Sequence, residues 1–196
     1  MPYFYAVMIR KATKPSIDKE KAESLIVYIC HKMRDCDGFG ATLNSKALYY
    51  IDHVNYLKFG KKLTGMRYVK QKFGPTPKPQ DFLPIKEKLI HEGKLEEREC
   101  EYFGKLQKKL LALADPDVSC FSGEEIALID TIIERLLPYN GKTISDVSHQ
   151  ELSWKVADSM EELPEYAFLF TESSLTDEDL AWARRVIDEQ SPSKVH

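Results

Sequence analysis

The chain has 196 residues, of which 43% are apolar and 30% are charged, so it holds enough apolar mass for a core and is not a disordered chain. Its length favours one domain, and a formal net charge of −3 excludes a uniformly basic nucleic-acid-binding protein. The charge is uneven, because residues 1–114 carry 22 basic against 13 acidic side chains and residues 115–196 carry 6 against 18.

No uncharged run approaches the roughly 20 apolar residues of a transmembrane helix, and the first residues do not read as a secretory signal. We therefore expect a cytoplasmic protein with no membrane partner. The four cysteines form no close Cys-x-x-Cys pair, and the five histidines show no ligand spacing. We expect reduced thiols, no metal and no cofactor. Packing on an apolar helix face explains Cys30 and Cys36 better than metal binding does.

The first predicted elements, in chain order, are an edge strand in residues 2–14 and an amphipathic helix with Ser16 as its N-cap. The apolar spacing of this helix continues to about Arg34, and the helix is expected to end near Asp37-Gly38. A second helix should run from Asn44 to Phe59 and end at Gly60. Its apolar side chains cover about half of its circumference, which is typical of a central, buried helix. Asp52 and Asn55 lie in or beside this arc, so each needs a hydrogen-bond partner.

Between residues 62 and 73 the helical period disappears, which predicts extended chain around a turn at Gly65. The segment Gly74-Pro75-Thr76-Pro77 is expected to end all regular structure and to form a rigid, extended corner. A helix over residues 79–92 should follow. Its Pro84 is expected in or near the first turn, where the missing N–H does no harm.

Residues 94–115 are ambiguous, because leucines at helical spacing follow a charged run that resembles a β-wing; we favour strands. Ser122 and Glu125 predict a capping box at the start of a helix that reaches Leu137. A short helix over 143–150, an extended apolar segment over 163–170 and a C-terminal helix over 176–189 complete the chain. The fold class is therefore mainly α with a small β element (α+β), a compact helical domain with a β-hairpin or wing, and residues 1–196 form a single domain.

The motifs of several enzyme classes are missing from this sequence. It contains no phosphate-binding loop, dinucleotide-binding turn, His-Glu-x-x-His or Gly-x-Ser-x-Gly. Ser148 and His149 are neighbours, but on a helix they point about 100° apart and do not form a nucleophile and base with each other. Asp52 could orient His149 from a distance. The favoured role for the pair is to satisfy buried polar groups or to cap a helix near Trp154, so we expect no catalytic residue.

The stretch from His53 to Gln80 contains no acidic residue, and it carries several lysines and an arginine. Its basic side chains are Lys58, Lys61, Lys62, Arg67, Lys70, Lys72 and Lys78. Two interpretations stay open: a docking surface for a partner, or a solvated hairpin whose lysines discourage strand aggregation.

Five segments and one tryptophan occur in an order that resembles the signature of a known family. They are residues 47–53 (ALYYIDH), 60–69 (GKKLTGMRYV), 73–77 (FGPTP), 121–126 (FSGEEI) and 146–149 (DVSH), followed by Trp154. Together they resemble the Panacea domain, the SocA-like antitoxin family, over about residues 20–170. Thr76 departs from the family pattern, which has an apolar residue between the two prolines.

This resemblance implies a mostly helical domain that acts as the antitoxin of a bacterial or phage toxin–antitoxin pair and neutralises its cognate toxin by direct protein contact. A cytosolic protease is implied as a second partner, to which the antitoxin delivers the toxin. We take the candidates for partner contact to be Lys58, Lys61, Lys62, Arg67, Tyr68, Lys70 and Lys72. The signature residues with a structural role are Asp52, Gly65, Gly74, Pro75, Pro77, Ser148, His149 and Trp154.

Two other functions compete with this one. A winged-helix-like DNA-binding regulator would use helix 79–92 and the strands after it. That helix carries two lysines, Lys86 and Lys88, and three acidic residues, which is a poor charge balance for binding DNA. A small hydrolase would use Asp52 and His149, with Tyr68 in the same pocket. Convergence of these three side chains on a solvent-filled cleft would favour the enzyme.

Overall fold

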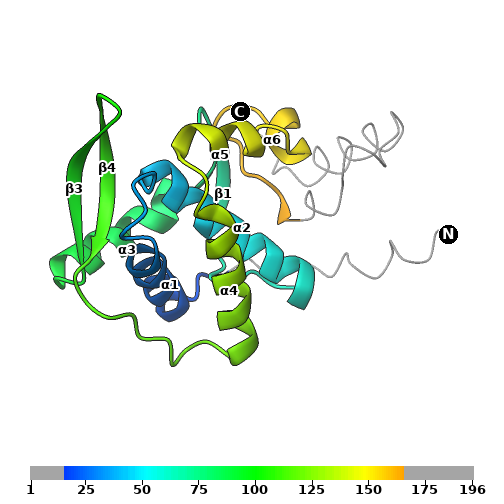
Figure 1. The fold of residues 1–196 in the computed structure, drawn as a ribbon. Helices are drawn as coiled ribbons and strands as arrows, with labels where there is room; N and C mark the ends of the chain where they lie inside the picture. Colours follow the sequence, from blue (N-terminus) through cyan, green and yellow to red (C-terminus); the bar gives the residue numbers. More distant parts are fainter. Residues whose placement is uncertain (1–15, 166–196) are drawn as a thin grey trace, which may run out of the picture.

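The computed structural model of the protein describes residues 16–165 (Figure 1). The helices of this part are α1 (Lys19–Lys32), α2 (Ala41–Phe59), α3 (Pro79–His91), α4 (Gly123–Leu136), α5 (Gly141–Ser148) and α6 (Leu152–Val156). The strands are β1 (Tyr68–Gln71), β2 (Gly74–Pro77), β3 (Leu95–Tyr102) and β4 (Lys105–Ala112). Strand β1 pairs with β2 and β3 pairs with β4, both antiparallel. The predicted α+β class is confirmed.

Helix α2 lies at the centre of the fold and packs against α1, α4, α5 and strands of both sheets. Its apolar arc is buried as predicted, with Leu48 and Ile51 fully enclosed in the core. The helix ends at Gly60, whose φ of 73° is the left-handed conformation of a C-cap glycine, also as predicted. It begins at Ala41, three residues earlier than the sequence indicated.

The N-cap of α1 is Asp18 and not Ser16, which corrects the prediction. The Asp18 carboxylate accepts a hydrogen bond from the backbone N–H of Lys21 at 3.1 Å. Its own backbone N–H is donated to the carbonyl of Thr64 at 2.9 Å, a residue far along the chain. This long-range bond fixes the extended backbone that an N-cap requires.

Strand β2 is the proline-rich corner, where the sequence predicted an end to regular structure; that prediction is wrong. Pro77 pairs with Tyr68 and Pro75 pairs with Lys70. The N–H of Lys70 is donated to Glu161, on the side of β1 away from β2, at 2.9 Å. The prolines therefore stand at positions where the ladder needs no donor from β2, and an edge strand tolerates them there.

Helix α3 begins at Pro79, so Pro84 is its sixth residue and lies inside the helix. The sequence placed Pro84 in or near the first turn, and the structure places it inside the helix, in the second turn. A proline at this position removes the hydrogen bond that its N–H would give to Gln80. The burial of apolar side chains of α3 offsets this lost hydrogen bond, since Ile85 and Leu89 are enclosed in the core.

Strands β3 and β4 form a hairpin, which confirms strands for the ambiguous region. The hairpin stands at one side of the helices in Figure 1, and its tip extends beyond them. Only the base of the hairpin joins the core, through Leu95 of β3 and Leu110 of β4, which are both buried.

Helix α4 begins with the predicted capping box, in which Ser122 and Glu125 bond reciprocally. Helix α5 begins at Gly141, two residues before the predicted start, because Asn140 caps it. The short helix α6 was not predicted. Its N-cap, Glu151, makes no capping hydrogen bond with its side chain, so the local sequence carries no start signal.

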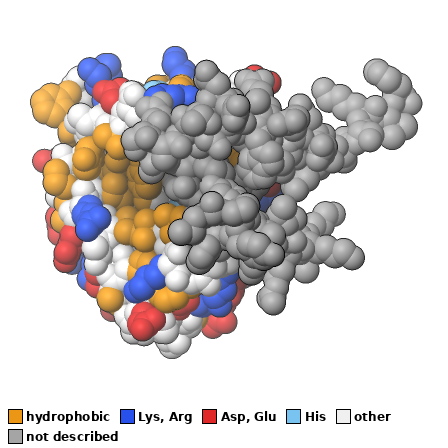
Figure 2. All heavy atoms as spheres, turned by 90° about the vertical axis from the view of Figure 1, so that its right-hand side faces the viewer, with side chains coloured by type: hydrophobic (Ala, Val, Ile, Leu, Met, Phe, Trp, Pro, Cys, Tyr) orange, Lys and Arg blue, Asp and Glu red, His pale blue; other side chains and the backbone are white. Residues whose placement is uncertain are grey.

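Three predicted elements lie outside the described residues: the edge strand in 2–14, most of the segment 163–170 and the helix over 176–189. Within residues 16–165 the four cysteines are free, and Cys30 packs in the core as expected. No helix among these residues combines the length and the apolar character that crossing a membrane requires. Figure 2 shows one face of the molecule, on which apolar side chains gather between scattered basic and acidic ones.

Candidate functional site

The signature residues form two buried polar clusters around the β1–β2 hairpin, and the first is centred on Asp52 of α2. The Asp52 carboxylate accepts hydrogen bonds from the backbone N–H of Thr64 at 2.7 Å, from the Thr64 hydroxyl at 2.5 Å and from the Tyr68 hydroxyl at 2.7 Å. The side chain is fully buried. We call Asp52, Thr64 and Tyr68 the Asp52 cluster. It provides the partner that the sequence required for Asp52.

The Asp52 cluster joins α2 to the loop before β1 and to β1 itself. Burial raises the pKa of Asp52 above its usual value, although the hydrogen bonds from Thr64 and Tyr68 oppose this shift. Burial and the neighbouring Asp52 carboxyl raise the pKa of the Tyr68 hydroxyl as well. Tyr68 therefore keeps its proton and acts as a hydrogen-bond donor.

The second cluster fastens β2 to α2 and α5, and it is centred on Lys46. The buried Lys46 ammonium donates a hydrogen bond to the carbonyl of Pro75 at 2.6 Å. Gly74 has a φ of 98°, and a Cβ at this position would collide with the Ser148 hydroxyl and lie 2.8 Å from Lys46 Nζ. Only glycine fits here. Ser148 is fully buried and donates to the carbonyl of Ser145 at 3.0 Å.

Glu151 completes this Lys46 cluster from the segment after α5. Its carboxylate accepts hydrogen bonds from the hydroxyls of Tyr49 at 2.5 Å and Tyr50 at 2.7 Å. Burial raises the pKa of Glu151, whereas the tyrosines and Lys46 lower it. Burial also lowers the pKa of Lys46 to about 7, against the opposing charge of Glu151. These contacts join the central helix to the Ser-His segment.

His149 and Trp154 stack on each other beside β1, with ring centroids 3.9 Å apart and ring planes 19° apart. The Trp154 indole N–H is donated to the carbonyl of Gln71 at 3.1 Å, and Lys70 Nζ lies 4.4 Å from the Trp154 ring centroid. Burial lowers the pKa of His149, so a neutral imidazole stacks on the indole at neutral pH. Both side chains are half-buried and brace the hairpin.

Gly65 and Pro77 complete the set that the resemblance marks as structural. Gly65 lies in the turn before β1, close to the backbone carbonyl of Ser16. Pro77 is buried at the end of β2. The structure brings the eight signature residues together around one hairpin. Six of them belong to the two clusters or to the His149–Trp154 stack, and Gly65 and Pro77 lie outside these groups.

Arg67, a candidate for partner contact, is engaged inside the fold. Its guanidinium donates to both oxygens of Asp81 at the start of α3, at 2.9 and 2.5 Å, and its backbone N–H donates to the same carboxylate at 3.0 Å. Burial raises the pKa of Asp81, but the bonds and charge of Arg67 outweigh it and hold that pKa below its usual value. Arg67 thus ties the loop before β1 to α3.

Three more of the contact candidates also serve the fold. Lys62 donates to the carbonyl of Met66 at 2.5 Å, and its side chain is only 5% exposed. Lys70 donates to the carbonyl of Ala157 at 2.8 Å. Tyr68 is 1% exposed, which removes it from any surface of this conformation. The candidates left exposed are Lys58, Lys61 and Lys72.

The three side chains of the hydrolase alternative do not converge on a solvent-filled cleft. Asp52 and Tyr68 are buried and bonded to each other, whereas His149 stacks on Trp154. Two hollows in the described part of the chain, near β3 and β4, are lined by other residues. The arrangement therefore holds a hairpin in place, and no nucleophile is paired with a base in it.

The layout for a winged-helix regulator is present, because α3 is followed by a hairpin, but the charges do not support it. Lys86 donates to Glu97 at 2.5 Å, and Lys88 donates to Glu23 at 2.6 Å. Both lysines of α3 are thus paired with carboxylates of the same chain, which leaves little positive charge on this helix for a phosphate backbone.

Sequence reasoning missed Lys46, Glu151 and Asp81 as members of the site. Lys46 had a usable signal, since a lysine within the wide apolar arc of a buried helix needs a partner as much as Asp52 does. Glu151 and Asp81 had none, because both lie in charged segments whose partners are far away in the sequence. Residues 16–165 contain no group of three His, Cys, Asp or Glu side chains placed to hold a metal ion.

Comparison with protein families gives one match that extends from α2 into α6. The model of the family described as antitoxin SocA-like, Panacea domain, matches residues 45–155, which is more than half of the chain. No curated protein and no solved structure matches the chain. Both buried clusters and the His149–Trp154 stack lie within the matched residues. The chain therefore belongs to the SocA-like antitoxin family with a Panacea domain.

Proposed function

We propose that this protein is the antitoxin of a toxin–antitoxin system and neutralises its cognate protein toxin in the cytoplasm by direct contact. The observation that carries the proposal is the family match over residues 45–155. The proposal requires no cofactor and no catalytic residue, because masking the surface of a toxin is enough to inhibit it.

The internal bonds of three charged residues around hairpin β1–β2 support a binding module over an enzyme. Asp52, Lys46 and Arg67 each form hydrogen bonds with groups of the same chain. Each bond joins a helix to a neighbouring strand or loop. Polar groups that are satisfied within the fold are typical of a scaffold. The contacts with a toxin then belong to exposed parts of the molecule.

A basic contact surface on this protein would consist of the exposed lysines of the acid-free stretch. Lys58 lies over the Phe59 ring and Lys72 over the Phe73 ring, with ammonium-to-centroid distances of 4.9 and 5.5 Å. Lys61 is exposed between them in sequence. These three lysines attract an acidic toxin surface without disturbing the fold.

Co-expression with the product of the adjacent small reading frame tests the proposed function. We expect this protein to restore growth of cells that make the toxin, and to co-purify with it as a stable complex in gel filtration. Rescue without detectable complex would contradict direct neutralisation. A cytosolic protease as second partner predicts that the toxin's half-life shortens when this protein is present, and a protease-deficient strain is the control.

A further inference from the structure

The tip of the β3–β4 hairpin exposes two apolar side chains to solvent. Phe103 is 88% exposed and Leu106 is 77% exposed, the highest values among the large apolar residues of the described part. Both belong to the end of the hairpin that extends beyond the helices (Figure 1). Neighbouring exposed apolar residues on a protrusion are typical of an interaction site.

The turn at this tip carries a residue that stability alone would not favour. Phe103 and Gly104 have φ values of 49° and 70°, as the two central residues of a type I′ turn require. Such turns prefer Asn-Gly, since a bulky side chain is strained at positive φ. Phe103 therefore contributes strain and exposed apolar surface to the isolated protein, where its ring meets that of Tyr102, and a partner that covers it would add apolar contacts.

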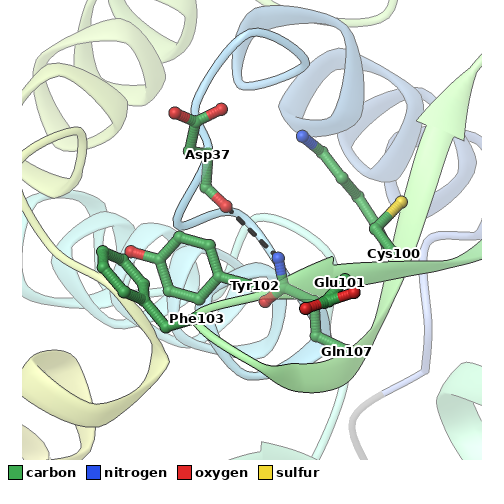
Figure 3. A pocket seen from close by; sticks show the side chains of 7 residues that line it. Asp37, Cys100, Glu101, Tyr102, Phe103 and Gln107 are labelled. Carbon is green, nitrogen blue, oxygen red and sulfur yellow. Dashed lines mark hydrogen bonds between the residues drawn. The ribbon is translucent and has the colours of Figure 1, made fainter.

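Strand β4 is anchored to the loop after α1 from the middle of the hairpin and from near its tip, so the tip is held in a defined position. Lys109 donates to the backbone carbonyls of Arg34 and Cys36, at 2.9 and 3.2 Å. Gln107 donates to the carbonyl of Asp37 at 3.2 Å (Figure 3). An anchored tip loses little conformational entropy when it binds, which favours affinity.

A hollow of about 440 Å³ opens beside the tip. It is lined by Asp37, Cys100, Glu101, Tyr102, Phe103, Gln107 and Lys109. Figure 3 shows Asp37 across the hollow from the rings of Tyr102 and Phe103, which meet edge to face with centroids 4.7 Å apart. A hollow whose lining includes carboxylates and aromatic rings is suited to the side chain of a lysine or an arginine.

Three carboxylates around the tip are unpaired within the described residues, and the unpaired cations Lys105 and Lys109 lie near them. Among the described residues, the carboxylates of Asp37, Glu99 and Glu101 make no ion pair, and Lys105 is the cation of the turn itself. Further down the hairpin, in contrast, Glu96 pairs with Arg98 at 2.7 Å. The tip therefore presents apolar surface flanked by carboxylates that have no ion-pair partner among the described residues.

We propose that the hairpin tip inserts Phe103 and Leu106 into an apolar recess of the toxin whose rim is basic. A lysine or arginine of that rim occupies the hollow between Asp37 and the tip aromatics. This inference rests on the proposed function and names the surface that performs it. Electrostatic complementarity with a basic rim speeds association, and the buried aromatic slows dissociation.

The first test replaces Phe103 in the full chain and measures binding to the purified product of the adjacent reading frame. Phe103→Asn restores the preferred turn residue, so we expect an unchanged or higher midpoint of denaturant unfolding together with an affinity at least about tenfold weaker. Leu106→Thr should weaken affinity in the same direction. The matched control is Leu113→Asn, because Leu113 is 59% exposed and follows β4 at the opposite end of the hairpin. It should leave affinity unchanged.

The second test reverses charge at the tip. The double variant Asp37→Lys and Glu101→Lys should reduce the association rate by about tenfold at low salt and by less at high salt, because salt screens the field. The control is Glu134→Lys, an equally exposed carboxylate on α4. A faster association of the tip variant would show that the toxin rim is acidic and would overturn the inference.

The outcomes separate this inference from the proposed function. If the unaltered protein binds no toxin, the proposed function fails and the inference fails with it. If the unaltered protein binds and Phe103→Asn binds equally well, only the inference is wrong. If Phe103→Asn changes self-association in sedimentation and leaves toxin affinity intact, the tip contacts a second copy of this chain, which also overturns the inference.

Discussion

The two hairpins of this molecule differ in how they are fastened. Hairpin β1–β2 is held at its strands and its turn: Lys46 bonds to Pro75, Ser145 bonds to the carbonyl of Phe73 at 3.0 Å, and Trp154 bonds to β1. Hairpin β3–β4 is fastened through Lys109 and Gln107 of β4 to the loop after α1, and its turn extends beyond the helices. A fastened hairpin is part of the scaffold, whereas a hairpin with a free, apolar tip is suited to contact.

The family signature concentrates in the fastened hairpin and its partners. Residues 60–69 and 73–77 supply the hairpin, and residues 146–149 contribute a helix segment that packs on it. A recognisable sequence pattern here reflects the geometric demands of packing.

The largest expected effect is that of adding a methyl group at Gly74. Gly74→Ala places a Cβ against Ser148 and Lys46 at a φ of 98°, so strain and overpacking combine to a loss of about 4 kcal/mol in unfolding free energy. Gly104→Ala is the control in the other hairpin, since its Cβ meets nothing within 4 Å, and it should lose about 1 kcal/mol. Denaturant unfolding measures both. Equal losses would contradict the contrast between the hairpins.

Removal of the Asp52 carboxylate should have the next largest effect. Asp52→Ala leaves the Thr64 and Tyr68 donors unpaired inside the core, so we expect a loss of about 3 kcal/mol. The matched control is Asp130→Ala, which removes a partly exposed carboxylate that accepts from Tyr28 at 2.8 Å, and it should lose about 1 kcal/mol. Normal stability of Asp52→Ala with loss of toxin neutralisation would instead identify Asp52 as a functional residue.

Local patterns made much of the fold predictable. The capping box of Ser122 and Glu125 and the stop of α2 at Gly60 depend on residues within one helical turn, and the structure confirms both. The wide apolar arc predicted that α2 is central. These features could be predicted because their physical causes are adjacent in the sequence.

The failures have causes that lie far away in the sequence. Strand β2 exists because β1 offers ladder positions that need no donor from Pro75 or Pro77, which the proline pattern alone does not reveal. In the candidate site, Arg67 looked free because Asp81 is fourteen residues away. Lys46 bonds to a carbonyl twenty-nine residues away. Burial of charged groups is a property of the assembled fold, so their roles had to be read from the structure.

Loss of the bidentate pair between Arg67 and Asp81, beside hairpin β1–β2, should have the next largest effect on stability. Arg67→Gln removes the hydrogen bonds of the guanidinium to Asp81, and we expect a loss of about 2 kcal/mol in unfolding free energy. The exposed Lys72→Gln in the same stretch is the control and should change stability by less than about 0.5 kcal/mol. If Arg67→Gln is as stable as the control, Arg67 is available to a partner after all.

The unfolding free energy of the protein should depend on pH through Lys46, which fastens hairpin β1–β2. Its pKa is about 7 in the fold and about 10.5 in the unfolded chain, so between these values the unfolded chain binds a proton that the folded chain lacks. Stability contributed by this site therefore rises from pH 7 to pH 10, with a slope of at most about 1.4 kcal/mol per pH unit. Lys46→Met should flatten the curve, whereas Lys58→Met should not. Parallel curves for wild type and Lys46→Met would contradict this shift.

The smallest effects on stability should come from the exposed lysines, and they sharpen the division between scaffold and surface. Lys58, Lys61 and Lys72 are exposed, so replacing each with Glu should change the unfolding free energy by less than about 0.5 kcal/mol. If they form a second contact surface, the triple variant binds toxin more weakly at low salt, with the difference shrinking as salt rises. If the triple variant binds toxin as tightly as the unaltered protein at every salt concentration, these lysines only face solvent. The toxin contacts then lie elsewhere, foremost at the β3–β4 tip.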